Sequence, residues 1–164
     1  MTPDVPEIFK WLEHTPVAAS VRESLWQFPA IETAHLLGMA VLVTTIGAFD
    51  LRLMGLVARG VPVSGLARRI FPWAWTAFAV QVLSGLLLFA SEATRMVINP
   101  AFRIKMILIG LGGIHALAFR WIAARDLPEW DENRTTPLKA RLAGLVSILI
   151  WVGVVAAGRW IGFV

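Results

Sequence analysis

The segment Ala30–Phe49 reads AIETAHLLGMAVLVTTIGAF, and apolar or small residues fill most of it. A bilayer core needs roughly 20 apolar residues per helix. Three further stretches approach or reach that length, namely Trp73–Ala90, Ile104–Ala124 and Leu142–Val164. Only 16% of the 164 residues are charged, whereas about a quarter are charged in an average soluble domain. The pattern predicts an all-α protein, a four-helix transmembrane bundle in one domain with spans at about 29–54, 72–93, 100–124 and 137–162.

Four prolines stand where these spans are expected to begin, at Pro29, Pro72, Pro100 and Pro137. Proline suits the first turn of a helix, because its missing N–H is not needed there. Asn99 and Thr136 precede two of these prolines and are expected to be N-caps. Between the spans, we expect Ser64–Ile70 to be a short interfacial helix and Asp126–Arg134 to be an acidic, solvated loop.

The segment Pro6–Leu25 mixes apolar residues with charged ones ahead of the first span. This mixture predicts an amphipathic helix, broken at Pro16, that lies on the outer membrane surface. A poorly ordered tail is the alternative. No basic n-region precedes the first apolar run, so we expect that run to stay in the mature protein.

The Lys and Arg residues are distributed unevenly between the two sides of the predicted bundle. Nine of them lie after spans one and three, at Arg52, Arg59, Arg68, Arg69, Arg120, Arg125, Arg134, Lys139 and Arg141, and the other six lie on the opposite side. Positively charged residues favour the cytoplasmic side, so both termini are predicted to lie outside the cytoplasm. The net charge is +4, but the basic residues form no stripe with interleaved aromatic residues, so no nucleic-acid partner is expected.

Two histidines, His35 and His115, lie within the apolar stretches. Ionisable residues inside a membrane are costly to insert and usually functional. Neutral imidazole is a common axial ligand of haem iron. The chain contains no cysteine, which excludes iron–sulfur clusters and c-type haem attachment. The pair therefore predicts a haem b held between two helices, and the alternative is that each is a core histidine hydrogen-bonded to neighbouring groups.

Glycines accompany both histidines at helical spacing. Gly38 lies one turn beyond His35, and Gly112 lies one turn before His115. Glycines beside a ligating histidine would clear space for the porphyrin. Small residues also simply allow membrane helices to approach closely, so both interpretations stay open. Gln81 and Ser84 on span two are expected to face the bundle interior, where such residues form hydrogen bonds between helices.

The depth of the two histidines decides whether one haem can bind both. At a rise of 1.5 Å per residue, we expect an offset of about 9 Å, which helix tilt can absorb. If span three ended at Arg120, the offset would grow to about 15 Å, too large for one haem. The second ligand of His35 would then be His14, Met39, Met106 or a residue of a neighbouring subunit.

Haem propionates are anions that must leave the hydrocarbon region or pair with cations. Arg95, Arg103 and Lys105 cluster at the outer ends of spans two and three. Arginine binds a carboxylate in bidentate fashion. We therefore predict a haem near the outer face, with its propionates directed toward Arg95, Arg103 or Arg22.

The chain resembles a family of small, uncharacterised four-helix bacterial inner-membrane proteins. The similar segments are RESLWQFPAIETAHLLGMA (Arg22–Ala40), FDLRLMGL and GLLLFASEATRMVINPAFRIKMILI, within a region from about Phe9 to Arg125, and the H-L-L-G element at His35 is the most recognisable. The resemblance implies architecture and a bacterial inner-membrane location rather than an activity, and it favours His35 over His115 as a ligand. The arrangement is also distantly similar to cytochrome b561 bundles and copper-resistance membrane domains, which carry more histidines.

These observations predict a b-type cytochrome-like electron carrier in the lipid bilayer, with membrane quinone as its electron partner. A homo-oligomer is expected, because four short helices offer little surface to enclose a haem. The alternative is a non-catalytic membrane partner subunit or a small transporter bundle without a cofactor. Copper held by His35 with Met39 is a third option. Whether the protein is a membrane oxidoreductase component stays open.

Overall fold

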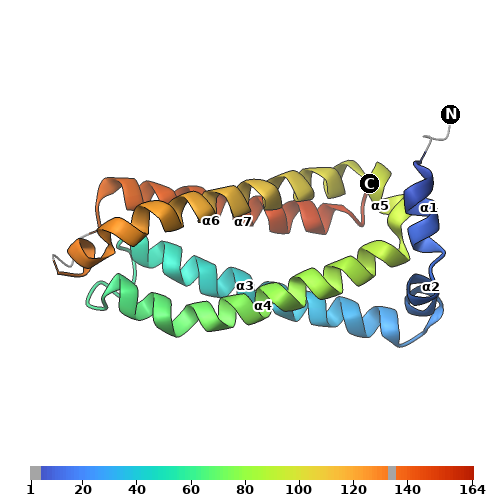
Figure 1. Ribbon diagram of the computed structural model, residues 1–164, viewed down its shortest axis with the longest axis horizontal. Helices are drawn as coiled ribbons and strands as arrows, with labels where there is room; N and C mark the ends of the chain where they lie inside the picture. The colour runs from blue at the N-terminus through green and yellow to red at the C-terminus, as the bar shows by residue number, and fades with distance from the viewer. Residues whose placement is uncertain (1–4, 133–135) are drawn as a thin grey trace.

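The computed structural model describes residues 5–132 and 136–164, and it contains no strand in those ranges. Seven helices follow one another: α1 (Glu7–Glu13), α2 (Pro16–Glu23), α3 (Gln27–Leu53), α4 (Val63–Ser91), α5 (Ala93–Ile98), α6 (Pro100–Glu132) and α7 (Leu138–Trp160). Four of them, α3, α4, α6 and α7, are long and apolar enough to cross a membrane. They lie side by side along the molecule (Figure 1). The predicted all-α, four-helix transmembrane bundle is confirmed.

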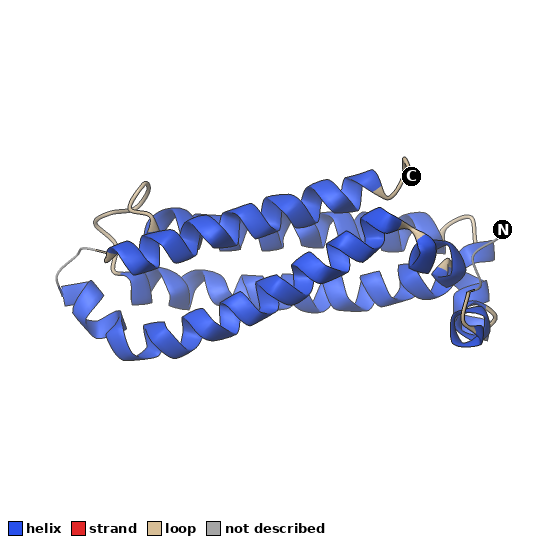
Figure 2. Cartoon of the chain, turned by 90° about the horizontal axis from the view of Figure 1, so that it is seen from above, coloured by secondary structure: helices blue, strands red, loops and turns tan. Residues whose placement is uncertain are grey.

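The long helices pack as two pairs, α3 along α4 and α6 along α7. The pairs meet where α3 contacts α7 and where α4 contacts α6. The turn between α3 and α4 lies at one end of the bundle, which we call the loop end (Figure 1). Both chain ends and the short helices α1, α2 and α5 lie at the other, which we call the terminal end (Figures 1 and 2). The first described residues and the C-terminus therefore lie at the same end of the bundle.

The buried core lies at the loop end. Its cluster consists of Phe49, Leu53, Val63, Trp130 and Ala140. The Phe49 ring on α3 packs against the Phe119 ring on α6, with ring centroids 6.1 Å apart. This contact brings the rings of Phe49 and Phe119 to about the same depth and so indicates the register of α3 against α6. Helix α7 also packs against α3, and it approaches so closely that a Cβ at Gly144 would lie 2.8 Å from the Asp50 carbonyl oxygen.

The second span begins earlier than predicted. Ser64–Ile70, predicted as a separate interfacial helix, is the first part of α4, and Pro72 lies inside that helix rather than at its start. A proline inside a helix removes one hydrogen bond and costs about 3 kcal/mol. Val63 is fully buried in the loop-end core, and Ala67 and Ile70 pack against that core. This burial offsets the cost of the proline and keeps the helix continuous.

The third long helix extends further than predicted. Asp126–Arg134, predicted as a solvated loop, is helical as far as Glu132, and Arg134 lies outside the described residues. Trp130 is buried in the loop-end core. The Asp131 carboxylate accepts a hydrogen bond from a backbone N–H in the first turn of α4. These two contacts anchor a segment that composition alone predicts to be solvated.

The two predicted N-caps differ in outcome. Asn99 caps α6, because its Oδ1 accepts a hydrogen bond from the Phe102 N–H at 3.1 Å. Pro137, and not Thr136, is the N-cap residue of α7. The Thr136 hydroxyl is instead 3.2 Å from a guanidinium nitrogen of the buried Arg52. A buried charge needs partners, and Thr136 supplies one at the expense of capping.

The N-terminal segment Pro6–Leu25 is a pair of short helices, α1 and α2, broken just before Pro16 as predicted. Thr15 caps α2 by accepting a hydrogen bond from the backbone of its first turn. The Glu13 carboxylate accepts hydrogen bonds from the N–H and the hydroxyl of Thr94, the N–H at 2.9 Å. The segment is therefore docked on the terminal end of the bundle, and its place on the membrane surface stays a prediction.

Candidate functional site

His35 lies in the terminal half of α3, with its imidazole ring against α4. Its Nδ1 is 2.9 Å from the Ser84 hydroxyl oxygen. That hydroxyl donates its own proton to the Val80 carbonyl oxygen, so it accepts a hydrogen bond from His35, and Nδ1 carries the imidazole proton. The lone pair is then on Nε2, which has no hydrogen bond to any residue that the structure describes.

The imidazole ring of this histidine packs against one turn of α4. A Cβ at Gly85 would lie 3.2 Å from Cε1 of His35, so a larger residue would displace the ring. The side-chain amide of Gln81 donates a hydrogen bond to the His35 carbonyl oxygen. Gln81 and Ser84 therefore face the bundle interior and bond between helices, as predicted. In addition, they orient the histidine.

Lys105 reaches the same region from α6. Its Nζ would lie 3.4 Å from a Cβ placed at Gly158 of α7, and counting along α6 from Phe119, which contacts Phe49, places it at about the depth of His35. No described residue forms an ion pair or a hydrogen bond with its ammonium group. We call His35, Ser84, Gly85, Lys105 and Gly158 the interior centre. All four spans contribute to it.

His115 contacts α7 and lies outside the interior centre. Its Nε2 is 3.1 Å from the Ala143 carbonyl oxygen of α7 and donates a hydrogen bond to it. Counting along α3 and α6 from the level pair Phe49 and Phe119 places His115 about 15 Å from His35 along the bundle. The structure therefore does not bring the two histidines together, and their joint ligation of one iron stays a prediction without geometric support.

The glycines predicted to clear space for a porphyrin lie at helix contacts. A Cβ at Gly38 would lie 3.0 Å from Cγ1 of Val80, where α3 meets α4. A Cβ at Gly112 would lie 3.4 Å from Cγ2 of Ile150, where α6 meets α7. Both positions match the alternative interpretation, in which small residues let membrane helices approach closely.

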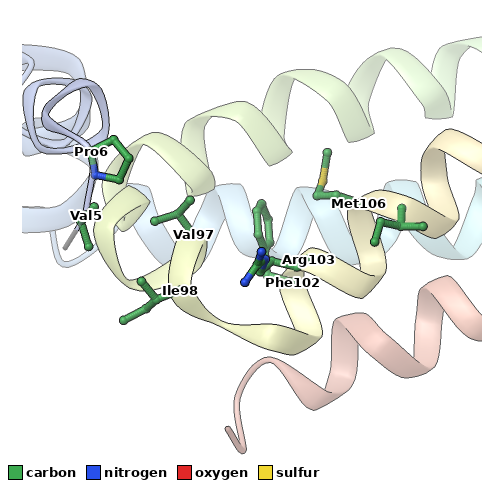
Figure 3. A pocket seen from close by; sticks show the side chains of 8 residues that line it. Val5, Pro6, Val97, Ile98, Phe102, Arg103 and Met106 are labelled. Atoms are coloured by element: carbon green, nitrogen blue, oxygen red, sulfur yellow. The ribbon is translucent and has the colours of Figure 1, made fainter. Parts of the chain in front are cut away.

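The three predicted propionate partners are placed differently. Arg22 pairs with Glu13 at 3.6 Å, and Arg95 pairs with Glu92 at 3.2 Å. Arg103 lines a pocket of about 570 Å³ at the terminal end (Figure 3). The other lining residues are apolar and come from the chain just before α1, from α5 and from α6: Val5, Pro6, Val97, Ile98, Phe102, Met106 and Ile107. Arg22 and Arg95 therefore already have carboxylate partners within the chain.

The donor set limits what the interior centre can hold. Within residues 5–132 and 136–164, no three His, Cys, Asp or Glu side chains lie close enough together to hold a metal ion. A single imidazole with an unused Nε2 and a hydrogen-bonded Nδ1 nonetheless matches the usual arrangement of a metal-ligating histidine. Nε2 of His35 would therefore serve as one ligand of a haem. Gly85 makes room for the imidazole ring itself, and Gly158 makes room for the side chain of Lys105.

Sequence reasoning selected His35 but did not connect it with Gly85, Gly158 or the charge of Lys105. The signals were an ionisable residue inside each of two spans and a glycine in each of the other two. Which residues face one another depends on the rotation and depth of each helix, and composition does not supply either.

The chain belongs to the family of unknown function DUF6644, whose profile matches residues 27–164. The match begins at the first residue of α3 and includes all four spans. No curated protein and no solved structure matches the chain. The family confirms the resemblance to proteins without an assigned function, and it supplies neither a cofactor nor an activity.

Proposed function

We propose that this member of DUF6644 binds haem b through His35 and carries electrons within a bacterial inner membrane. The observation that carries the proposal is the orientation of His35, which donates Nδ1–H to Ser84 and leaves Nε2 unused inside the bundle. Histidines that ligate metals usually donate their other ring N–H to a neighbouring acceptor, which fixes the tautomer and the ring orientation. Imidazole is also a common axial ligand of haem.

A bound haem would supply one-electron chemistry, and the chain would supply ligand, orientation and electrostatics. Nε2 of His35 would be the ligating atom, and Ser84 would hold the ring in place. His115 lies about 15 Å from His35 along the bundle, so bis-histidine ligation would require α6 to slide past α3. We therefore assign one imidazole ligand per chain.

Membrane quinone is the proposed electron partner, since it is lipid-soluble and can reach a haem inside the bilayer. We also propose a homo-oligomer. Gly110 and Gly113 on α6 are exposed, with no atom within 4 Å of an added Cβ. Such small residues permit close contact with another membrane helix. Native mass spectrometry in mild detergent should then show more than one chain per particle.

The visible spectrum tests the proposal directly. Protein purified from haem-replete cells should show a Soret band and visible bands that shift on reduction with dithionite, and its pyridine haemochrome should identify a non-covalent b haem. His35→Ala should lose these bands because the ligand is removed. His115→Ala is the matched control and should keep the bands while it loses a helix–helix hydrogen bond. Colourless wild-type protein would overturn the proposal.

The second candidate is a cofactor-free membrane partner subunit. It is favoured by the contacts of Gly38, Gly112 and His115, all of which are explained by helix packing. This candidate predicts colourless protein, an His35→Ala variant that folds and assembles normally, and a second protein that copurifies with the chain.

A further inference from the structure

Lys105 is a cation inside a membrane span, with no ion pair or hydrogen bond to any described residue. Ionisable side chains within membrane helices are rare, face the bundle interior or a cavity, and mark sites for a partner. A lysine near the end of a helix can direct its ammonium group to the interface. Here, the side chain is half-buried and its Nζ lies beside Gly158, at 3.4 Å from an added Cβ.

The depth of Lys105 matches that of His35. Phe49 and Phe119 are level with each other, and both α3 and α6 run from the terminal end to the loop end. His35 precedes Phe49 by as many residues as Lys105 precedes Phe119. At equal rise per residue, the two side chains therefore lie at the same level of the bundle.

We propose that Lys105 binds a carboxylate of the ligand that His35 coordinates, and that it neutralises a haem propionate in place of Arg22, Arg95 or Arg103. This inference rests on the proposed haem function. His35 and Lys105 lie on α3 and α6, which face each other diagonally across the bundle and contact through the rings of Phe49 and Phe119. A ligand between these helices would meet the imidazole on one side and the ammonium group on the other.

The arginines are less suitable for the same task. Arg22 and Arg95 already have carboxylate partners. Arg103 is two residues from Lys105 on one helix, a rotation of about 200°, so the two side chains point to different sides of α6. Arg103 is exposed and lines the terminal-end pocket (Figure 3), whereas Lys105 is half-buried.

Hemin dimethyl ester, whose propionates are esterified and uncharged, tests the contact by changing the ligand instead of the protein. The full-length chain, purified from haem-depleted cells, is titrated with hemin and with hemin dimethyl ester, and the Soret band gives a Kd for each. Wild-type protein should prefer hemin by about tenfold, because a charge-assisted hydrogen bond is worth roughly that factor in affinity. Lys105→Met should abolish the preference and leave the Kd for the ester unchanged, since methionine keeps the length and the helix propensity. Unchanged binding of the ester also shows that the variant is folded.

Arg103→Met is the matched control on the same helix and should keep the preference for hemin. If Lys105→Met keeps the preference, or if the preference disappears with Arg103→Met, the role of Lys105 is wrong while the His35 site stands. If neither compound shifts its Soret band with wild-type protein, the proposed function fails, and the Lys105 inference fails with it.

Discussion

At the scale of single residues, the interior centre depends on one neutral hydrogen bond. Ser84 accepts from Nδ1 of His35 and donates to Val80 of its own helix. The serine therefore links the imidazole to the backbone of α4, and no other described side chain bonds to that ring. A ligand held by a single imidazole is sensitive to the loss of this acceptor.

Replacement of Ser84 by alanine should weaken haem binding by about 10- to 100-fold, the usual effect of removing the hydrogen-bond partner of a metal-ligating histidine. Hemin titration of detergent-solubilised protein measures the change. Thr76→Ala is the control, because the Thr76 hydroxyl bonds only to the backbone of the same helix, at Pro72. Equal affinity of Ser84→Ala and wild-type protein would contradict the role of the serine.

At the scale of helices, the closest approach between the two pairs is that of α7 to α3. It depends on Gly144, where an added Cβ would lie 2.8 Å from the backbone carbonyl oxygen of Asp50. Backbone atoms cannot move aside as a flexible side chain can. A side chain at position 144 would therefore push α7 away from α3 and loosen the loop-end core around Leu53.

Gly144→Ala should destabilise the bundle by about 1–3 kcal/mol, the range for overpacking a well-packed core. Thermal unfolding in detergent, followed by circular dichroism, measures the loss. The control is Gly47→Ala on α3, where the added methyl group meets no atom within 4 Å. Alanine is the better helix former by about 1 kcal/mol, so the control should be as stable as wild-type protein or more so. A Gly144→Ala variant that is as stable as wild-type protein would contradict the close contact.

The docking of α1 and α2 on the bundle is an electrostatic contact as well as an apolar one. Partial burial raises the pKa of Glu13, but the hydrogen bonds from Thr94 and the charge of Arg22 outweigh it, so the pKa lies below its ordinary value. A lowered pKa in the folded state stabilises the ionised form. The stabilisation is complete above the unfolded value of about 4.3 and is lost as the pH falls through the folded value.

Glu13→Gln should therefore loosen the N-terminal helices at pH 7, by about 1–3 kcal/mol for bonds to a charged group. Limited proteolysis of the segment before α3 measures the loosening. The difference from wild-type protein should disappear in acid below the lowered pKa, where the wild-type carboxyl group is also neutral. Glu7→Gln, at a mostly exposed ion pair with Lys10, should have little effect at either pH. A pH-independent difference for Glu13→Gln would contradict the electrostatic origin.

At the scale of the whole molecule, the sides of the bundle are apolar. Many large apolar side chains on the four spans are exposed, as expected where lipid replaces water. Both termini lie at one end and the α3–α4 turn at the other (Figure 1). The excess of Lys and Arg is expected at the loop end, and the positive-inside rule then predicts that this end faces the cytoplasm.

The orientation is testable with single cysteines, because the chain contains none of its own. Val164→Cys at the terminal end should react with a membrane-impermeant maleimide in intact spheroplasts. Gly60→Cys at the loop end, where an added side chain meets no atom within 4 Å, should react only after lysis. Each variant is the control for the other. The reverse pattern would invert the orientation and leave the fold unchanged.

The positions of the four spans could be predicted from the sequence, because length and hydropathy are properties of one segment at a time. The N-cap role of Asn99 and the break before Pro16 followed from local chemistry in the same way. The continuation of α4 through Pro72 and of α6 to Glu132 could not be predicted. Both depend on side chains that are buried by other helices, Val63 in one case and Trp130 in the other.

The sequence by itself also selected His35, because an ionisable residue within an apolar run is rare enough to identify without a structure. The tertiary structure alone decided its neighbours. It separated His35 from His115, placed Ser84 on Nδ1 and brought Lys105 to the same depth. The physical reason is that the rotation and register of helices are set by packing between distant segments. The contacts of Gly85, Gly144 and Phe119 determine them here, and each joins residues from different spans.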